Sequence, residues 1–269
     1  MLLEETLFGT IDKVKVAIER LKEHEPPEGY YVCFSGGKDS TVMYDLVKKS
    51  GVKYDVHYSI MTVEPPDLLE FVKTNYPEVE MIKPPFSMFD LIEKHGMPPM
   101  RKFRFCTFEL KMSKGAGRTK VDGVRAQESR KRKGYKIFDE DRKNGGYFLH
   151  VIHDWTEKEI WQYIRENKLP YCKLYDKGFK RLGCLLCPCA VPRTIALDLK
   201  TFPEVAEKYR QACCKAYEKR IARGKSYKKW ISGDDMFNDW IAILLKTDFK
   251  AVKTKQNEIS LFEKDEVSK

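Results

Sequence analysis

The sequence predicts an α/β fold in which a mainly parallel sheet is followed by a smaller, mostly helical region that carries cysteines. Short apolar runs rich in β-branched and aromatic residues alternate with segments whose apolar residues have helical spacing. Such alternation is typical of parallel strands joined by helices that cover the sheet. Beyond about residue 170 the chain changes character and continues as helices around a cysteine-rich segment. We therefore expect two domains, 1–170 and 171–269.

The elements of the first domain follow in a regular order. Apolar residues between positions 4 and 23 have helical spacing and stop before Pro26-Pro27, so we expect an opening helix there. A strand, a pair of glycines and a second helix come next. The remaining pattern continues the alternation of strands and helices. The predicted strands are 30–34, 54–61, 79–82 and 121–126, and the later predicted helices are 66–74 and one that starts at Asp154-Trp155-Thr156.

Apolar residues at helical spacing form two faces in the second domain, and each face predicts a helix. The tail from about Asp248 is polar, and we expect it to fray. The two faces consist of Val205, Tyr209 and Ala212 in one helix and of Trp240, Ile241 and Leu244 in another.

Composition narrows the class of protein. The 269 residues include 50 Lys and Arg against 40 Asp and Glu, which gives a net charge of +10 and favours a polyanionic partner such as a nucleotide or nucleic acid. A lysine-rich solvated face would give the same total. No apolar run approaches the roughly 20 residues that span a bilayer, and the N-terminus lacks a basic region followed by an apolar one. We therefore expect a cytoplasmic protein without a membrane partner.

The loop after the first predicted strand of the sheet has the features of a phosphate site. It reads Ser35-Gly36-Gly37-Lys38-Asp39-Ser40 and opens a helix, so backbone N–H groups and the positive end of the helix dipole meet there. The glycines allow close approach of an anion, the serines add hydroxyl donors, and Lys38 adds a positive charge. Asp39 cannot bind phosphate directly, so we expect it to hold Mg²⁺ that bridges phosphates. The alternative is an ordinary glycine turn capped by Ser and Asp.

A second polar constellation runs from Val121 to Arg132 and again leads from an apolar strand into a basic segment. Two of its arginines could hold an anion bidentately, although a charge run by itself is usually a solvated loop. Further stretches follow in the chain. They are Asp154-Trp155-Thr156 with Ile160-Trp161, Leu169-Pro170-Tyr171 with Leu174-Tyr175, and Gly178-Phe179 leading to Gly183-Cys184 and Cys187-Pro188.

These motifs carry a resemblance to a known family. The loop is not a Walker A motif, because Val32 stands where that pattern needs glycine; it resembles the SGGxDS loop of the PP-loop ATP pyrophosphatases. Together with the later stretches, the chain from about residue 30 to 240 resembles the phosphoadenosine phosphosulfate (PAPS) reductase family in its broad sense. That family includes sulfonucleotide reductases and ATP-cleaving sulfur-transfer enzymes, among them the DNA phosphorothioation type.

The resemblance implies a fold and a set of site residues. The fold is an adenine nucleotide α-hydrolase-like (Rossmann-like) sheet, with adenine near the end of the strand at Met61-Thr62. The segment from Gly123 is expected to line the phosphate or sulfate end of the nucleotide, and the catalytic groups are expected to be Lys38, Asp39, Arg125 and Arg132. The nucleotide-binding residues of this segment are expected to be Gly123, Arg125, Glu128 and Ser129.

The cysteines suit metal or redox chemistry better than structural disulfides. The chain has eight of them and no secretion signal, and Cys184 and Cys187 can grip one metal from a tight turn. Cys106 resembles the upstream cysteine that family members bring to the same place, although Thr107 stands where some relatives have a second cysteine. The fourth ligand stays open: Cys189 is nearest, and Cys172, Cys213 and Cys214 are alternatives. We expect an iron–sulfur cluster, with structural zinc or free thiols as alternatives.

Three functions fit the sequence. The first is an ATP pyrophosphatase that forms AMP and pyrophosphate, adenylates an acceptor and helps to replace oxygen by sulfur, with nucleic acid as a candidate acceptor and a protein as a candidate sulfur donor. Lys38 and Asp39 favour it, because they would stabilise charge on the leaving pyrophosphate. The second is a sulfonucleotide reductase, which in that branch needs a cysteine within Glu-Cys-Gly-Leu-His, and this sequence contains no such stretch. The third is a nucleotide-binding adaptor without turnover.

Overall fold

A computed structural model describes residues 2–6, 9–112 and 114–247. Within these ranges the chain divides into two compact units. The first comprises 2–60, 64–84 and 110–183, and the second comprises 61–63, 85–109 and 184–247. The division into domains at residue 170 stays a prediction, and the tail expected to fray from Asp248 lies outside the described residues.

A six-stranded sheet forms the centre of the first unit. Its strand order is β5-β4-β3-β6-β8-β7, and every neighbouring pair is parallel except β7 with β8. The mainly parallel α/β fold predicted from the sequence is therefore confirmed. The strands are β3 (Tyr30–Cys33), β4 (Tyr54–Ser59), β5 (Glu80–Ile82), β6 (Lys120–Asp122), β7 (Phe138–Glu140) and β8 (Tyr147–His150).

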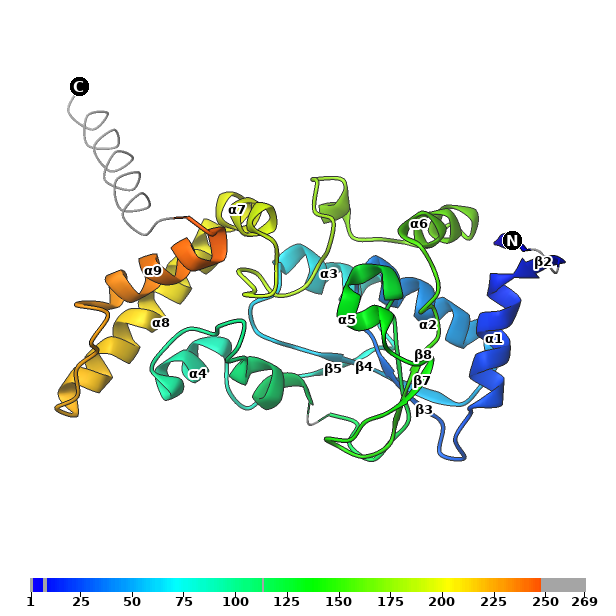
Figure 1. Ribbon diagram of the computed structural model, residues 1–269, viewed down its shortest axis with the longest axis horizontal. Coiled ribbons are helices and arrows are strands. Elements are labelled where there is room, and N and C mark those ends of the chain that lie inside the picture. The colour runs from blue at the N-terminus through cyan, green and yellow to red at the C-terminus, as the bar shows by residue number, and fades with distance from the viewer. Residues whose placement is uncertain (1, 7–8, 113, 248–269) are drawn as a thin grey trace, which may run out of the picture. The chain divides into compact units, whose positions relative to one another are not determined.

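The hydrophobic core lies on one face of this sheet. Val56, Val32, Val121 and Leu149 stand in register across four adjacent parallel strands, and each is buried. Three helices pack side by side on this side of the sheet (Figure 1), since α2 contacts both of the others. They are α1 (Lys13–Glu23), α2 (Lys38–Ser50) and α6 (Glu157–Glu166), and the unit also contains α3 (Pro66–Asn75) and α5 (Arg130–Lys133).

The predicted opening helix is wrong in its first part. An antiparallel hairpin of β1 (Leu3–Thr6) and β2 (Gly9–Asp12) precedes α1, which begins only at Lys13. Asp12 stops the helix from extending backwards, because its Oδ1 accepts the N–H groups of Val14 at 3.0 Å and Lys15 at 3.3 Å as an N-cap. Gly9 has a φ of +118°, which a helix does not allow.

Other predicted boundaries shift because the chain leaves the sheet early. The predicted strand 54–61 ends at Ser59, and 121–126 becomes β6, which ends at Asp122. Sequence reasoning missed the β7–β8 hairpin altogether. The signal was present in Asn144-Gly145-Gly146, where both glycines have positive φ and turn the chain between the two strands.

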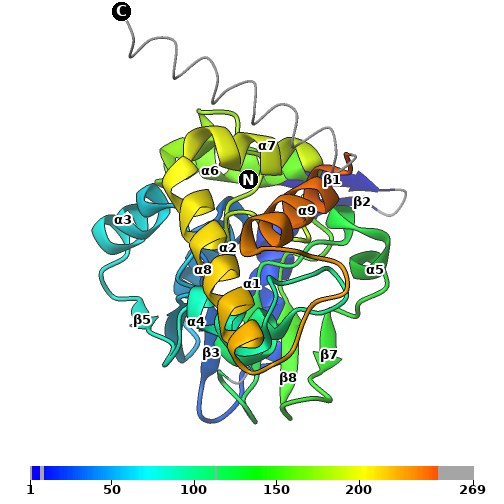
Figure 2. The ribbon, with the colours of Figure 1, turned by 90° about the vertical axis from the view of Figure 1, so that its left-hand side faces the viewer.

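The second unit is helical, as expected. It contains α4 (Met88–His95), α7 (Pro192–Thr201), α8 (Pro203–Ala222) and α9 (Gly233–Leu245). Figure 2 shows the long helix α8, which packs against both α4 and α9. The predicted apolar faces meet here, since the rings of Tyr209 on α8 and Trp240 on α9 lie 5.0 Å apart. Within the described ranges, no helix is long and apolar enough to cross a membrane.

Candidate functional site

The loop between β3 and α2 depends on a glycine that no other residue could replace without strain. Gly36 has a φ of +67°, in the left-handed region that favours glycine. A Cβ on this residue would stand 2.6 Å from Cγ2 of Val72 and 2.9 Å from Cδ1 of Leu68, both on α3. The tight turn expected from the sequence is therefore enforced both by the backbone and by the packing of the neighbouring helix.

The two serines of the loop hold its shape. The Oγ atom of Ser40 accepts the backbone N–H of Ser35 at 3.2 Å and donates to the carbonyl oxygen of Gly37 at 2.9 Å. The hydroxyls of Ser35 and Ser40 lie 3.0 Å apart. Gly37 is the N-cap of α2 and has no side chain to cap it, so the first turn of α2 directs N–H groups and the positive end of the helix dipole out of the loop.

Three charged side chains meet at this end of α2. Asp39 accepts the Nε–H of Arg125 on Oδ1 at 2.6 Å and the ammonium of Lys38 on Oδ2 at 3.1 Å. The side chains of Lys38 and Arg125 are 5% and 4% exposed, so both cations are desolvated, and Asp39 is the anion that compensates them. The predicted catalytic residues Lys38, Asp39 and Arg125 are thus brought together, from positions 86 residues apart in the chain.

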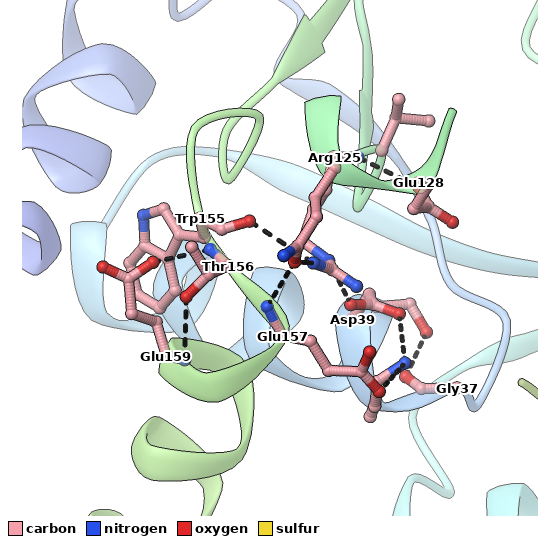
Figure 3. A network of polar contacts seen from close by, with 12 residues as sticks. Gly37, Asp39, Arg125, Glu128, Trp155, Thr156, Glu157 and Glu159 are labelled. Carbon is pink, nitrogen blue, oxygen red and sulfur yellow. Dashed lines mark hydrogen bonds and ion pairs between the residues drawn. The ribbon is translucent and has the colours of Figure 1, made fainter. Parts of the chain in front are cut away.

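Arg125 is fixed by further contacts. Its Nη1 donates to Oε1 of Gln127 at 3.2 Å and to the carbonyl oxygen of Trp155 at 3.3 Å. The same Gln127 oxygen accepts the N–H of Glu157 at 2.8 Å, and Oε1 of Glu157 lies 3.9 Å from Nζ of Lys38. Figure 3 shows Arg125 pointing toward Asp39 beside the start of α6, where Glu157 lies.

Gly123 brings the second polar segment against the loop. A Cβ at this position would lie 3.0 Å from the backbone carbonyl carbon and oxygen of Asp39 and 3.1 Å from the backbone nitrogen of Ser40. No side chain fits here without moving the first turn of α2. The glycine therefore allows the close backbone approach that places Arg125, two residues later, next to Asp39.

Within the described residues, the other predicted residues of this segment bond to one another and to the backbone of Arg125, but not to Lys38 or Asp39. Arg132 pairs with Glu128, and the second carboxylate contact of Glu128 is the backbone N–H of Arg125 at 3.0 Å. The hydroxyl of Ser129 accepts the N–H of Arg132 at 3.2 Å and caps α5. In the part of the chain that the structure describes, no hydrogen bond or ion pair joins Arg132 to Lys38 or Asp39. The catalytic role of Arg132 stays a prediction.

Met61 and Thr62, predicted near adenine, belong to the second unit. Met61 is buried, and Thr62 has a φ of +66° and accepts the backbone N–H of Met88 on Oγ1 at 2.8 Å. The hydroxyl of Thr62 thus fixes the start of α4. Their contact with a nucleotide stays a prediction.

Sequence reasoning missed three residues of the site. Gln127 and Glu157 complete the surroundings of Arg125 and Lys38, and Tyr175 accepts the backbone N–H of Lys38 on its hydroxyl oxygen at 2.9 Å. Burial raises the pKa of Tyr175, so its hydroxyl stays protonated at neutral pH. Their place beside recognised motifs could have identified two of them. Glu157 follows the Asp154-Trp155-Thr156 stretch, and Tyr175 ends the Leu174-Tyr175 pair.

The cysteines proposed as metal ligands lie in the second unit. Burial raises the pKa of the Cys106 thiol, and the nearby Cys187 raises it further. Burial also raises the pKa of Tyr209, and the thiols of Cys184, Cys187 and Cys106 raise it further. The alternative Cys213 acts on the same phenol, whereas Cys189 lies 3.6 Å from Nη1 of Arg104.

The turn that carries Cys184 and Cys187 is anchored by a buried carboxyl. The backbone N–H of Leu186, whose φ is +52°, donates to Oδ2 of Asp198 at 2.9 Å. Burial raises the pKa of Asp198 to about 6. Across the described ranges, however, no three or more His, Cys, Asp or Glu side chains are arranged to hold a metal ion. As they stand, the cysteines of the described residues therefore do not form a ligand set for a metal ion.

Comparison with known proteins gives three relevant findings. The model of the phosphoadenosine phosphosulfate reductase domain matches residues 29–190. An uncharacterized protein of Methanocaldococcus jannaschii is 29% identical over 190 residues, which cover 65% of this chain and 45% of that protein. A protein of Oceanobacillus iheyensis named adenosine 5'-phosphosulfate reductase is 26% identical over 172 residues, which cover 60% of this chain and 71% of that protein.

Among solved structures, the phosphate complex of phosphoadenylyl-sulfate reductase from Candida auris has a similar fold. Its TM-score is 0.50 at 20% identity, and the match covers 62% of this chain and 87% of that one. At this identity the likeness concerns the fold alone. The chain spans less than half the length of the archaeal relative and about 71% of the bacterial one.

Proposed function

Because the chain belongs to the phosphoadenosine phosphosulfate reductase family, we propose that it binds ATP at the loop of residues 35–40 and cleaves it to AMP and pyrophosphate. An acceptor oxygen forms a bond to the α-phosphate as the bond to pyrophosphate breaks, and AMP leaves with that oxygen when a sulfur donor replaces it. The observation that carries the proposal is the cluster of Lys38, Asp39 and Arg125 at the N-terminal end of α2. The cluster combines fixed positive charge with a carboxylate at the place where a helix binds phosphate.

Each of the three residues has a role in the proposed reaction. Lys38 and the N–H groups of α2 hold the pyrophosphate and stabilise the negative charge that it gains as the bond to the α-phosphate breaks. Arg125 is held by Gln127 and Trp155, and its role in the proposed reaction is to bind the α-phosphate. Asp39, with phosphate oxygens, is suited to hold Mg²⁺, which supplies further charge neutralisation for the leaving group.

The test of this role compares two lysines of the same helix. Lys38→Ala should reduce pyrophosphate release at least 100-fold, the scale of losing one electrostatic stabiliser of a transition state, while ATP binding weakens much less. Lys48→Ala is the matched control, because Lys48 lies in the last turn of α2 with its side chain 41% exposed. An unchanged rate of pyrophosphate release in Lys38→Ala would rule out the role.

Nucleic acid is the proposed acceptor. The support is the net charge of +10 and the helix α5, which follows Ser129 directly and exposes Arg130, Lys131 and Lys133. Phosphate contacts release counterions, so the affinity for a single- or double-stranded oligonucleotide should fall steeply as salt rises. An affinity that does not change with salt would contradict this acceptor.

A metal centre at Cys106, Cys184 and Cys187 is a separate proposal, with Cys189 or Cys213 as the fourth ligand. It is supported by the effect of Cys187 on the pKa of Cys106 and by the effect of all three thiols on the pKa of Tyr209, and thiolate ligands suit an iron–sulfur cluster or structural zinc. Anaerobic purification followed by iron, sulfide and zinc analysis decides between them. A colourless, zinc-loaded protein would contradict the cluster.

Sulfonucleotide reduction is the second candidate function, because relatives in this comparison are named adenosine 5'-phosphosulfate reductase. The same loop and Arg125 would then hold the nucleotide of an adenylyl sulfate. Incubation with a sulfonucleotide and reduced thioredoxin distinguishes the two functions: sulfite release supports reduction, whereas pyrophosphate release from ATP supports the first proposal. Nucleotide binding without either product supports a binding module.

A further inference from the structure

A short segment after α6 holds a tyrosine over the phosphate loop. The 3₁₀ turn Lys173–Tyr175 is fixed in the first unit, because the side chains of Cys172 and Leu174 are buried on either side of Lys173. The backbone N–H of Phe179 returns to the carbonyl oxygen of Leu174 at 3.2 Å. The ring of Tyr175 packs edge-on against Trp161 of α6, with ring centroids 5.1 Å apart. Tyr175 is thus held in place from both its backbone and its ring.

The hydroxyl of Tyr175 lies where the loop presents its positive charge. It accepts the N–H of Lys38, the first residue of α2, at 2.9 Å, and it lies 3.5 Å from the place of a Cβ on Gly37. The ammonium of Lys38 is 5.6 Å from the centre of the same ring. The hydroxyl oxygen therefore shares the end of α2 with any anion that the loop binds.

The hydroxyl of Tyr175 can still donate a hydrogen bond at this place. A hydroxyl has one hydrogen to donate and can accept others, and the hydrogen bond from Lys38 uses only its acceptor capacity. Because burial raises the pKa of Tyr175, the proton stays on the oxygen at neutral pH. That proton is available to a phosphate oxygen beside the same N–H group.

A cavity lies beside Tyr175, next to the loop residue Lys38 rather than lined by it. A cavity of about 280 Å³ lies against Tyr175 and is also lined by Glu157, Trp161, Phe179 and Lys180. The ammonium of Lys38 reaches toward the same side, since its Nζ lies 3.4 Å from the carbonyl oxygen of Lys180 and 3.9 Å from Oε1 of Glu157.

We propose that Tyr175 is a further phosphate-contacting residue of the site, which donates its hydroxyl hydrogen to the phosphate held by the loop at the first turn of α2. The proposal rests on the proposed function, since it requires that residues 35–40 bind the phosphates of a nucleotide. The alternative predicts the opposite change in affinity. If the hydroxyl only occupied the N–H of Lys38, it would compete with phosphate, and its removal would tighten phosphate binding.

The experiment measures binding of ATP, inorganic pyrophosphate and adenosine by calorimetry to the full chain and to two variants. Tyr175→Phe keeps the ring and its contact with Trp161 but removes the hydroxyl. Tyr171→Phe is the matched control, because Tyr171 also meets Trp161 edge-on, at 5.4 Å, while its hydroxyl bonds to Asp176 at 3.2 Å rather than to the loop.

We expect Tyr175→Phe to weaken ATP and pyrophosphate binding about tenfold or more, the scale of a lost hydrogen bond to a charged group. Adenosine binding should be unchanged in both variants, and Tyr171→Phe should bind all three ligands as the unaltered chain does. A structural role would instead weaken all ligands together and lower the melting temperature. Tyr175→Phe binding ATP equally well or more tightly would overturn the proposal alone, whereas an unaltered chain that binds neither ATP nor pyrophosphate would overturn the proposed function with it.

Discussion

Gly123→Ala tests whether close backbone approach builds the site. The added Cβ would stand 3.0 Å from the backbone of Asp39 and 3.1 Å from that of Ser40, and these atoms belong to a helix rather than to a flexible side chain. The first turn of α2 or the strand end after β6 must therefore move by a few tenths of an ångström. That movement would disturb the 2.6 Å contact between Asp39 and Arg125.

Gly123→Ala should lower the free energy of unfolding because it overpacks the site. Inserting one methyl group into a tightly packed site costs about 1–3 kcal/mol. For a chain of this size, about 1 kcal/mol shifts the melting temperature by roughly 2–4 °C, so we expect a decrease of about 2–12 °C. ATP binding should weaken as well, because the variant moves charged groups and not only core atoms.

Thermal melting and ATP calorimetry measure both effects, and Gly134→Ala is the matched control. Gly134 has a φ of −85°, and a Cβ there would meet its nearest atom, the carbonyl oxygen of Lys131, at an ordinary 3.6 Å. The control should melt and bind ATP as the unaltered chain does. If Gly123→Ala matched the control in both measurements, the close approach would not be what positions Arg125.

Two further predictions concern Arg125 and Asp198. Arg125→Lys should weaken ATP binding and lower the free energy of unfolding by about 1–3 kcal/mol, because one ammonium cannot reach Asp39, Gln127 and Trp155 together. Calorimetry measures the binding and urea unfolding measures the stability. Unchanged values in both would contradict the prediction. Burial raises the pKa of Asp198 to about 6 from an ordinary 3.8, so the folded carboxyl keeps its proton longer than the unfolded one and stability falls as pH rises between these values. Asp198→Asn should remove this loss, which reaches about 3 kcal/mol above pH 6, and parallel pH profiles of melting for both proteins would refute it.

The sequence predicted the parts of the fold in which local pattern and packing agree. Residues 30–47 read as strand, glycine loop and helix, and they fold so because Val32 lies in the buried centre of the sheet and Gly36 permits a left-handed turn. The N-terminal hairpin was mistaken for helix because Ile11 happens to fit the helical spacing of Val14 and Ile18. Gly9 and the capping residue Asp12 were the signals against it.

Only the residues of the candidate site that lie within recognisable motifs could be predicted from the sequence. Lys38, Asp39 and Arg125 lie in recognisable segments, and the structure places them in contact. Tyr175 stands 137 residues from Lys38, and nothing in the spacing of one sequence fixes which distant hydroxyl approaches a given N–H. Arg132 pairs instead with Glu128, which stands four residues before it but in a separate short helix.

Product analysis after incubation with ATP and Mg²⁺, with and without nucleic acid, tests the central claim most directly. We predict one pyrophosphate for each adenylate, counted as free AMP plus adenylated acceptor, with pyrophosphate release about 100-fold lower in Lys38→Ala and kept in Lys48→Ala. Formation of ADP and phosphate, or ATP that stays intact under every condition while it binds the loop, would contradict the account.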